Sequence, residues 1–165
     1  MLLVANRGEI ALRIIRTATE LGLATIAVYA EDDAGCPHVG AATRAVALAG
    51  SGPAAYLDQD AILRIARDTD CTLVHPGYGF LSENAAFADR CADAGVTFVG
   101  PDPDALRTFG DKQTARATAA SLGIPVVPAS GSGTPEDLRA FLTQHPDGIV
   151  VKARAGGGGR GMRIV

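Results

Sequence analysis

The N-terminal part of the chain alternates short apolar runs with amphipathic helical stretches, and this alternation constrains the fold more than any other feature. Four of the runs are long enough for buried strands: residues 2–5, 23–29, 72–75 and 96–99. Between the first two, Ile10, Ile14 and Leu21 recur at helical spacing, and Gly22 is a natural stop. A strand–helix–strand order favours a parallel pair with a right-handed crossover. The sequence therefore predicts an α/β fold with parallel strands joined through helices.

The rest of the chain divides at a soft stretch, residues 129–133, which read Ala-Ser-Gly-Ser-Gly and are typical of a linker. Before it, residues 31–40 are expected to form a solvated loop, and Ser82 is expected to cap the helix that follows it. Further helices are expected at residues 58–68, 104–109, 111–122 and 134–145. We expect one domain over residues 1–122, then a linker and the incomplete start of a second domain over residues 123–165.

Charge and composition narrow the classes of function. The chain has 165 residues and a net charge of −3 without a basic stripe, so we expect no nucleic-acid partner. No apolar run approaches the length of a membrane span, and we expect a cytoplasmic protein. Three cysteines without C-x-x-C spacing and three scattered histidines predict neither a disulfide framework nor a metal site.

A glycine-rich loop joins two apolar runs, residues 149–151 and 162–165. It contains Gly156, Gly157, Gly158, Gly159, Arg160 and Gly161. Such a loop can lay backbone N–H groups over phosphates, and Lys152, just before it, can add a compact positive charge. No helix follows the loop and no Gly-Lys-Ser/Thr closes it, so neither the dinucleotide-binding pattern nor the Walker A pattern applies. The sequence predicts either a flap over a nucleotide or a glycine hairpin without a ligand.

Two other places are candidates for ligand contacts. Lys112, one of only two lysines among 15 basic residues, falls in the first turn of an expected helix, where a cation opposes the helix dipole. It is either a solvated lysine or a contact to an anion. His75 ends an expected buried strand, and Tyr78 and Gly79 follow in a constrained turn. Because ligands bind beyond the carboxyl ends of parallel strands, His75 either lines a site or is satisfied by the backbone of this turn.

Taken together, these stretches resemble the biotin carboxylases along the whole chain and in register. Five of them carry the likeness: residues 5–11, 75–84, 98–101, 110–112 and 152–162. The first, Ala-Asn-Arg-Gly-Glu-Ile-Ala, resembles the opening of the family. The second, His-Pro-Gly-Tyr-Gly-Phe-Leu-Ser-Glu-Asn, looks like its most recognisable internal segment, and the last is similar to the glycine flap of its ATP-grasp domain. The chain departs from the family pattern at Arg154, where a small residue is usual, and at Gly35-Cys36.

The resemblance implies an α/β fold: a doubly wound parallel sheet, which is the Rossmann-like preATP-grasp domain, followed by a truncated α+β ATP-grasp segment. It implies the half-reaction shared by biotin-dependent carboxylases, among them the acetyl- and propionyl-CoA carboxylases of fatty acid metabolism. In it MgATP activates bicarbonate, and biotin on a carrier domain is carboxylated. The implied partners are a biotin carboxyl carrier domain and a carboxyltransferase, which chooses the acceptor. In the family, the magnesium ligands and the base lie beyond Val165, so we expect no catalytic residue here and no activity from this chain alone.

The resemblance also implies roles for three groups of residues. Lys112, Lys152 and the flap would bind ATP, with Met162 beside the adenine. The biotin side of the cleft would be lined by His75, Tyr78 and Gly79. The polar face of the first helix, with Arg13, Arg16 and Glu20, would form part of a homodimer contact, or else it is a solvated face.

Two other functions stay open from the sequence. Another ATP-grasp ligase, such as carbamoyl-phosphate synthase, shares the fold plan and the lysine–glycine flap, although residues 75–84 favour the carboxylase. The third hypothesis is non-enzymatic: an inactive fragment that binds a carboxylase partner.

Overall fold

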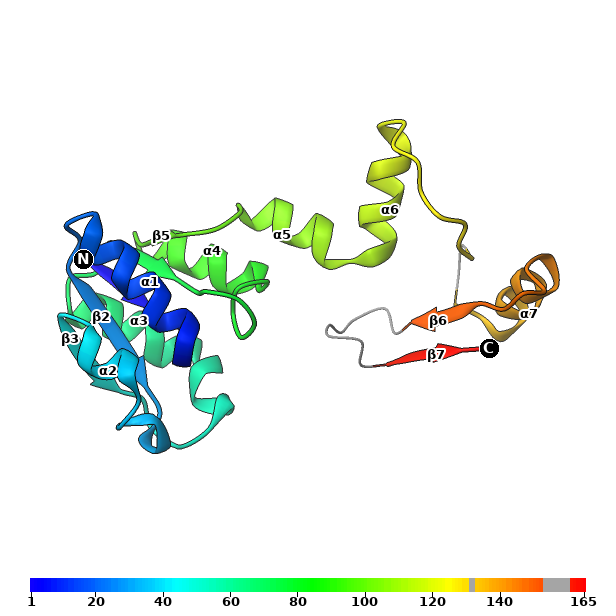
Figure 1. The fold of residues 1–165 in the computed structure, drawn as a ribbon. Coiled ribbons are helices and arrows are strands. Elements are labelled where there is room, and N and C mark those ends of the chain that lie inside the picture. The colour runs from blue at the N-terminus through cyan, green and yellow to red at the C-terminus, as the bar shows by residue number, and fades with distance from the viewer. Residues whose placement is uncertain (131–132, 153–160) are drawn as a thin grey trace. The chain divides into compact units, whose positions relative to one another are not determined.

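The structure is a computed structural model that describes residues 1–130, 133–152 and 161–165 (Figure 1). Its contacts divide the chain into two compact units, Met1–Leu106 and Arg107–Val165. This division falls earlier than the domain boundary predicted after residue 122. Helix α6 (Lys112–Ser121), in which no residue is buried, therefore falls in the second unit.

A five-stranded parallel sheet forms the centre of the first unit. Its strands are β1 (Leu2–Val4), β2 (Thr25–Tyr29), β3 (Arg44–Ala47), β4 (Leu73–His75) and β5 (Thr97–Phe98). They lie in the order β3-β2-β1-β4-β5. The chain runs outward from β1 to β3 and then returns to the other side of β1 for β4 and β5. The carboxyl ends of β1 and β4 therefore flank the topological switch point, the crevice where open parallel sheets bind ligands.

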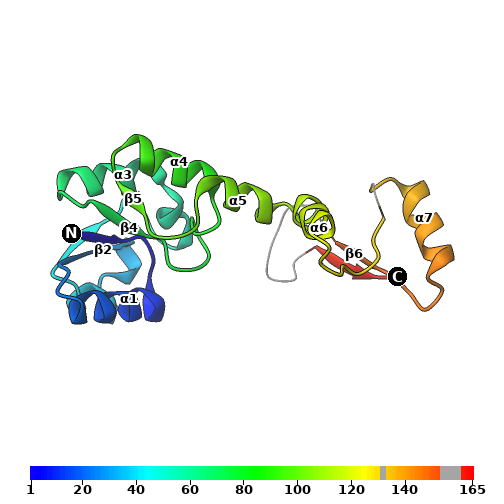
Figure 2. The same ribbon diagram turned by 90° about the horizontal axis from the view of Figure 1, so that it is seen from above.

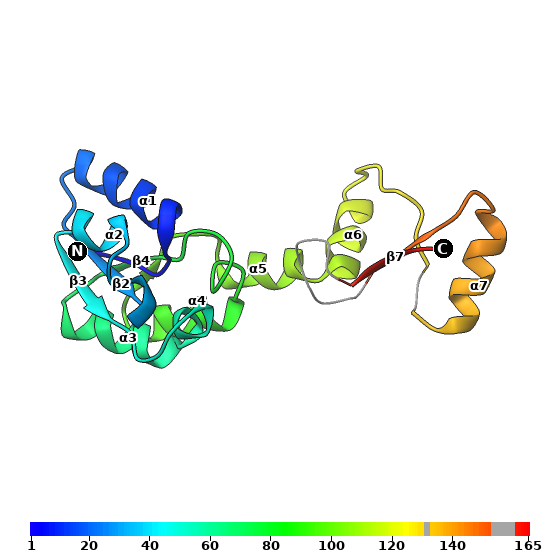
Figure 3. The ribbon, with the colours of Figure 1, turned by 60° about the horizontal axis from the view of Figure 1, so that its bottom comes forward.

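Helices cover both faces of this sheet, which confirms the doubly wound α/β prediction (Figure 2). Helix α1 (Gly8–Glu20) lies on one face and contacts α2 (Pro37–Ala41), while α3 (Gln59–Asp68) and α4 (Ala85–Asp93) lie on the other (Figure 3). Side chains alternate along β1, so that Leu2 and Val4 pack with α1 and Leu3 packs with α3 and α4. Each such fully buried side chain contributes about 1.5–3 kcal/mol.

Two local predictions for this unit were wrong. Residues 31–40 are not a plain loop, because they contain the 3₁₀ helix η1 (Glu31–Asp33) and helix α2, which Pro37 opens in its first turn. The cap of α4 is not Ser82 but Asn84, whose side chain accepts a hydrogen bond from the N–H of Phe87 at 2.9 Å. A second 3₁₀ helix, η2 (Pro53–Leu57), precedes α3.

The second unit contains helices and one small antiparallel sheet. After α5 (Pro103–Gly110), which spans the division between the units, come α6 and α7 (Pro135–Gln144). Thr134 caps α7, as the sequence predicts, by accepting from the N–H of Asp137 at 3.3 Å. Strands β6 (Val150–Lys152) and β7 (Met162–Ile164) form the expected hairpin. Within the described ranges, no helix combines the length and the apolar character that a membrane span requires.

Candidate functional site

Asn6 ties together the carboxyl ends of the two strands at the switch point. It follows β1 directly and is only 2% exposed. Its Nδ2 atom donates to the carbonyl oxygens of Pro76 at 2.7 Å and Tyr78 at 2.9 Å, and its Oδ1 atom accepts from the N–H of Arg7 at 2.8 Å. A buried amide with these three bonds is well satisfied, so it holds the turn after β4 in one position.

The turn after β4 has a conformation that only glycine fits at one position. Gly77 has a φ of +69°, and a Cβ atom there would lie 2.6 Å from Nδ2 of Asn6. Gly79 also has a positive φ, +66°, but open space surrounds its Cα. The two glycines therefore differ: both need the left-handed region, and Gly77 also needs to lie flat against Asn6.

His75 uses one ring nitrogen to support this same turn. Its Nδ1 atom accepts a hydrogen bond from the N–H of Gly77 at 3.0 Å, so the ring is neutral with its proton on Nε2. Burial lowers the pKa of His75, and the positive charge of Arg13 lowers it further. The structure thus gives His75 the backbone partner that the sequence left open, and Nε2 is the atom left to meet a ligand.

Tyr78 and Glu9 form the exposed part of this cluster. The Tyr78 side chain is 60% exposed, and its hydroxyl donates to Oε1 of Glu9 at 2.8 Å. This hydrogen bond and the negative charge of Glu9 raise the pKa of Tyr78, so the phenol stays protonated. Sequence reasoning named Tyr78 but missed Asn6 and Glu9 as site residues. The signal for both was a polar stretch directly at the carboxyl end of the first buried strand.

A buried polar network lies beside this cluster, around Asp33. Its carboxylate accepts from Nη2 of Arg7 at 2.7 Å and from the Tyr56 hydroxyl at 2.7 Å. The Tyr56 oxygen in turn accepts from the N–H of Ala30 at 3.0 Å. Burial alone would raise the pKa of Asp33, but the hydrogen bonds from Tyr56 and Cys36 and the charge of Arg7 outweigh it, so the pKa is lowered. The network fixes Arg7, and with it the segment that begins at Asn6.

The residues predicted to bind ATP lie in the second unit. Lys152 and Met162 occupy paired positions in the β6–β7 hairpin, so the structure brings these two together. Lys112 opens α6, whose N-cap is Asp111. Gly161, with a φ of +77°, leads into β7. The remaining flap residues, Gly156, Gly157, Gly158, Gly159 and Arg160, lie outside the described residues.

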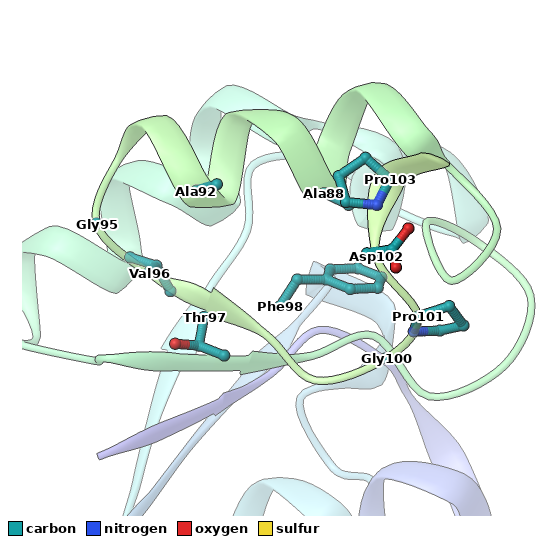
Figure 4. A pocket seen from close by; sticks show the side chains of 10 residues that line it. All are labelled: Ala88, Ala92, Gly95, Val96, Thr97, Phe98, Gly100, Pro101, Asp102 and Pro103. Atoms are coloured by element: carbon teal, nitrogen blue, oxygen red, sulfur yellow. The ribbon is translucent and has the colours of Figure 1, made fainter. Parts of the chain in front are cut away.

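Two shallow hollows lie on the first unit. One, of about 440 Å³, follows the exposed face of α1 and brings together the predicted dimer residues Arg13, Arg16 and Glu20. The other, of about 410 Å³, lies between α4 and the segment after the edge strand β5, with the Phe98 ring across it (Figure 4). Its one charged lining residue is Asp102, whose carboxylate caps the N–H of Ala105 at 2.7 Å. Without a cation in its lining, this second hollow does not suit a phosphate.

The described residues offer no ready metal site. Nowhere in those ranges do three His, Cys, Asp or Glu side chains come together as a set of ligands.

Comparison with known families agrees with this arrangement of motifs. Residues 1–106 match the family described as "Biotin carboxylase, N-terminal domain". Residues 111–165 match the family described as "Carbamoyl-phosphate synthase L chain, ATP binding domain".

Individual relatives match over nearly the whole chain. A chloroplastic biotin carboxylase of Arabidopsis thaliana is 47% identical over 99% of this chain and 31% of its own length. The solved structure of a single-chain, multi-domain long-chain acyl-CoA carboxylase is 56% identical, with a TM-score of 0.89, over 99% of this chain and 15% of that one. The biotin carboxylase domain of the Hydrogenobacter thermophilus 2-oxoglutarate carboxylase is 39% identical, with a TM-score of 0.91, over 99% of this chain and 36% of that one.

The chain thus spans about a third or less of the length of these relatives. The match is nevertheless continuous through both units. It covers the turn at the switch point and the β6–β7 hairpin alike. On these grounds the chain belongs to the biotin carboxylase family.

Proposed function

We propose that this chain takes part in the ATP-dependent carboxylation of biotin by bicarbonate, as part of a longer chain. The observation that carries the proposal is the turn from His75 to Gly79, which lies at the switch point of the sheet and is held there by Asn6. This is where open parallel sheets bind their ligands. Membership of the biotin carboxylase family supplies the reaction, and it supports placing His75, Tyr78 and Gly79 on the biotin side of the cleft.

The β6–β7 hairpin suits a nucleotide. Lys152 offers a compact cation for phosphates, and Met162, in the paired position, offers a polarizable apolar surface for the adenine. Lys112 adds a second cation at a helix N-terminus, which itself favours phosphate. The solved biotin carboxylase domain from Hydrogenobacter thermophilus holds MgADP, ADP and bicarbonate. We assign ATP binding to Lys112, Lys152, Met162 and the flap residues Gly156, Gly157, Gly158, Gly159, Arg160 and Gly161.

Magnesium, when bound, would neutralise negative charge on the phosphates. Its ligands are proposed to lie outside the described residues, and the same is proposed for the groups that act on bicarbonate. The residues of this chain therefore hold and orient the substrates. The cations fix the phosphates of ATP, and the turn after β4 fixes one side of the biotin pocket.

Partners follow from the same family. We propose that a biotin carboxyl carrier domain delivers the biotin and that a carboxyltransferase uses the product. The acceptor is not encoded in this chain, since a long-chain acyl-CoA carboxylase and a 2-oxoglutarate carboxylase both match it over 99% of its length. The exposed α1 face with Arg13, Arg16 and Glu20 is proposed as part of a homodimer contact, and the Hydrogenobacter thermophilus domain was solved as a dimer. A cytoplasmic location stays a prediction from composition.

The test uses bicarbonate- and biotin-dependent ATP hydrolysis by the full-length protein. Lys152→Ala should lower kcat/KM for ATP by about 10- to 100-fold, since a hydrogen bond to a charged group contributes about 1.5–3 kcal/mol. The control is Arg139→Ala, which removes a cation of α7 that is 78% exposed. Unchanged ATP kinetics in Lys152→Ala would contradict the assignment. The 165-residue chain by itself should show neither bicarbonate-dependent ATP hydrolysis nor carboxylation of biotin.

A second candidate has one observation in its favour, the match of residues 111–165 to the ATP-binding domain of carbamoyl-phosphate synthase. The first unit and the relatives that match both units point to the carboxylase instead. The two are separated by the product: ATP turnover that depends on biotin supports the carboxylase, whereas formation of carbamoyl phosphate without biotin supports the other ligase.

A further inference from the structure

A single short segment of the chain makes hydrogen bonds to both the main chain and the side-chain hydroxyl of Tyr78. Asn6 donates to the Tyr78 carbonyl oxygen at 2.9 Å, and Glu9 accepts from the Tyr78 hydroxyl at 2.8 Å. Both residues belong to the segment in which β1 passes into α1, so the main chain and the ring tip of Tyr78 are positioned from one place.

Asn6 controls where the backbone of Tyr78 lies. Its amide is buried, and both of its donor bonds go to carbonyl oxygens of the turn, those of Pro76 and Tyr78. Gly77 lies so close to this amide that a Cβ atom would stand 2.6 Å from Nδ2. The turn is thus laid directly on the amide, and a group that cannot donate there would displace it.

Glu9 controls the direction of the phenol proton. A carboxylate only accepts hydrogen bonds, so the Tyr78 hydroxyl must donate its single proton to the hydrogen bond with Glu9. The phenol oxygen, on a side chain that is 60% exposed, then has only lone pairs to offer to a ligand. A ligand that meets this oxygen must bring its own donor.

We propose that Asn6 and Glu9 are positioning residues that present the Tyr78 oxygen as a hydrogen-bond acceptor for an N–H group of the substrate. The inference rests on the proposed function, in which the substrate is biotin. The ureido ring of biotin carries two N–H groups and a carbonyl oxygen, and an acceptor-only phenol oxygen selects an N–H edge over the carbonyl edge. Asn6 sets the place of this oxygen and Glu9 sets its polarity.

The kinetic test compares two isosteric variants of the full-length protein, with free biotin as substrate. Asn6→Asp keeps the acceptor for Arg7 but turns both donor bonds into contacts between a carboxylate and carbonyl oxygens. Glu9→Gln removes the charge and lets an amide donate to the phenol oxygen. Each should raise KM for biotin about two- to tenfold, the effect of one neutral hydrogen bond, and leave KM for ATP unchanged.

A matched control makes the same chemical change where only an acceptor is used. Asn84 caps α4 by accepting from the N–H of Phe87 at 2.9 Å, and aspartate caps helices as well as asparagine does. Asn84→Asp should therefore leave KM for biotin unchanged. A rise in KM for ATP equal to that for biotin in Asn6→Asp and Glu9→Gln would mean general structural damage and would overturn the inference.

A spectroscopic test needs no activity. The chain has three tyrosines and no tryptophan, so phenolate absorbance can be followed without interference. Because Glu9 raises the pKa of Tyr78, Glu9→Gln should lower that pKa. Tyr78→Phe should remove one step from the absorbance titration and so identify the step that belongs to Tyr78. If the wild-type protein shows no biotin-dependent turnover, the proposed function fails. The titration still tests whether the Tyr78 hydroxyl donates its hydrogen bond to Glu9. An unchanged Tyr78 titration in Glu9→Gln, or wild-type KM for biotin in both variants, overturns the inference.

Discussion

The two units of the chain differ in how completely they bury their apolar side chains. In Met1–Leu106, residues from several elements, such as Leu3, Tyr56 and Phe87, are 0% exposed. In Arg107–Val165, Phe109 is 68% exposed and Ile164 is 86% exposed. Among the described residues of this second unit, Ile149 alone counts as a buried apolar residue, at 8%.

This contrast also separates the two groups of residues that are proposed to bind ligands. The turn that carries Tyr78 rests on a sheet with cores on both faces, so its geometry is supported within its own unit. Lys152 and Met162 sit on a two-stranded hairpin, which is marginally stable in water unless further strands or helices cover it. The turn proposed to line the biotin pocket is thus preorganised by its own unit, while the hairpin proposed to bind ATP depends on burial that the described residues of its own unit do not supply.

Hydrogen exchange should show the largest difference between the units. Amides held by a sheet with cores on both faces, such as that of Val99, which donates to the Val74 carbonyl oxygen at 2.8 Å, exchange mainly through global opening, whereas amides of an uncovered hairpin exchange through local opening. On the 165-residue chain, Val74 and Val99 should exchange at least on the order of 10³-fold more slowly than Val150 and Val151, since global stability is typically 5–15 kcal/mol. Equal protection at all four amides would show that the hairpin docks on a stable core and would break the comparison.

A matched pair of phenylalanines, one from each unit, tests the difference in burial between the two units. Phe87 is 0% exposed and packs edge-to-face on Phe98 with ring centroids 6.1 Å apart, while Phe109 is 68% exposed. Phe87→Ala should lower the free energy of unfolding by about 3–5 kcal/mol, because it removes buried surface and leaves a cavity. Phe109→Ala should change it by about 0.5 kcal/mol or less. Urea unfolding of both variants measures the difference, and a cost for Phe109→Ala close to that of Phe87→Ala would contradict it.

A matched pair of glycines tests the close contact at the site. Gly77 and Gly123 have nearly equal φ angles, +69° and +72°, but a Cβ atom meets Asn6 at Gly77 and nothing within 4 Å at Gly123. Gly123→Ala should cost about 1–2 kcal/mol for the left-handed backbone alone. Gly77→Ala should cost about 1–3 kcal/mol more, because Asn6 must move and leave buried groups unpaired. Equal effects on unfolding in the two variants would show that the Asn6 contact contributes nothing.

The elements with strong periodicity could be predicted from sequence, and the contacts at the site could not. The four apolar runs and the helix between the first two predicted parallel strands joined through helices, whereas the strand order β3-β2-β1-β4-β5 comes from the structure alone. The motif of residues 75–84 gave the place of Tyr78. Its partners Asn6 and Glu9 lie 72 and 69 residues away in the chain, and no local pattern reports such a pairing.

Residues 31–40 were predicted to be solvated, and the structure buries part of them. Their three acidic residues suggested a solvated loop, yet Asp33 is 3% exposed and His38 is fully buried. The partners that allow Asp33 to be buried are Arg7 and Tyr56, which come from two other parts of the chain. Composition alone therefore could not show that this stretch belongs to the core of the first unit.

His38 gives the prediction with the smallest expected effect. It is fully buried, and in the described structure neither ring nitrogen has a hydrogen-bond partner. Burial lowers the pKa of His38; the nearby Val28 backbone, outside hydrogen-bonding geometry, and the charge of Asp33 oppose the shift without cancelling it. As the pH falls below the unfolded value of about 6.5, the unfolded state takes up a proton that the folded state refuses. The stability of the first unit should therefore fall on acidification, by at most about 1.4 kcal/mol per pH unit for this one group.

The variant that tests this is His38→Leu, which replaces an unsatisfied buried ring with an apolar side chain. It should change stability little at pH 8 and should flatten the loss of stability between pH 6.5 and pH 5. Part of the slope should persist, because the pKa of His75 is lowered by burial and by Arg13 in the same direction. Asp33 acts in a separate window, since its lowered pKa matters only below its ordinary value of 3.8. The matched change His145→Leu, in the second unit, should leave the pH dependence of the first unit intact. An unchanged slope in His38→Leu would show that His38 takes up its proton equally in the folded and unfolded chains, in conflict with its burial.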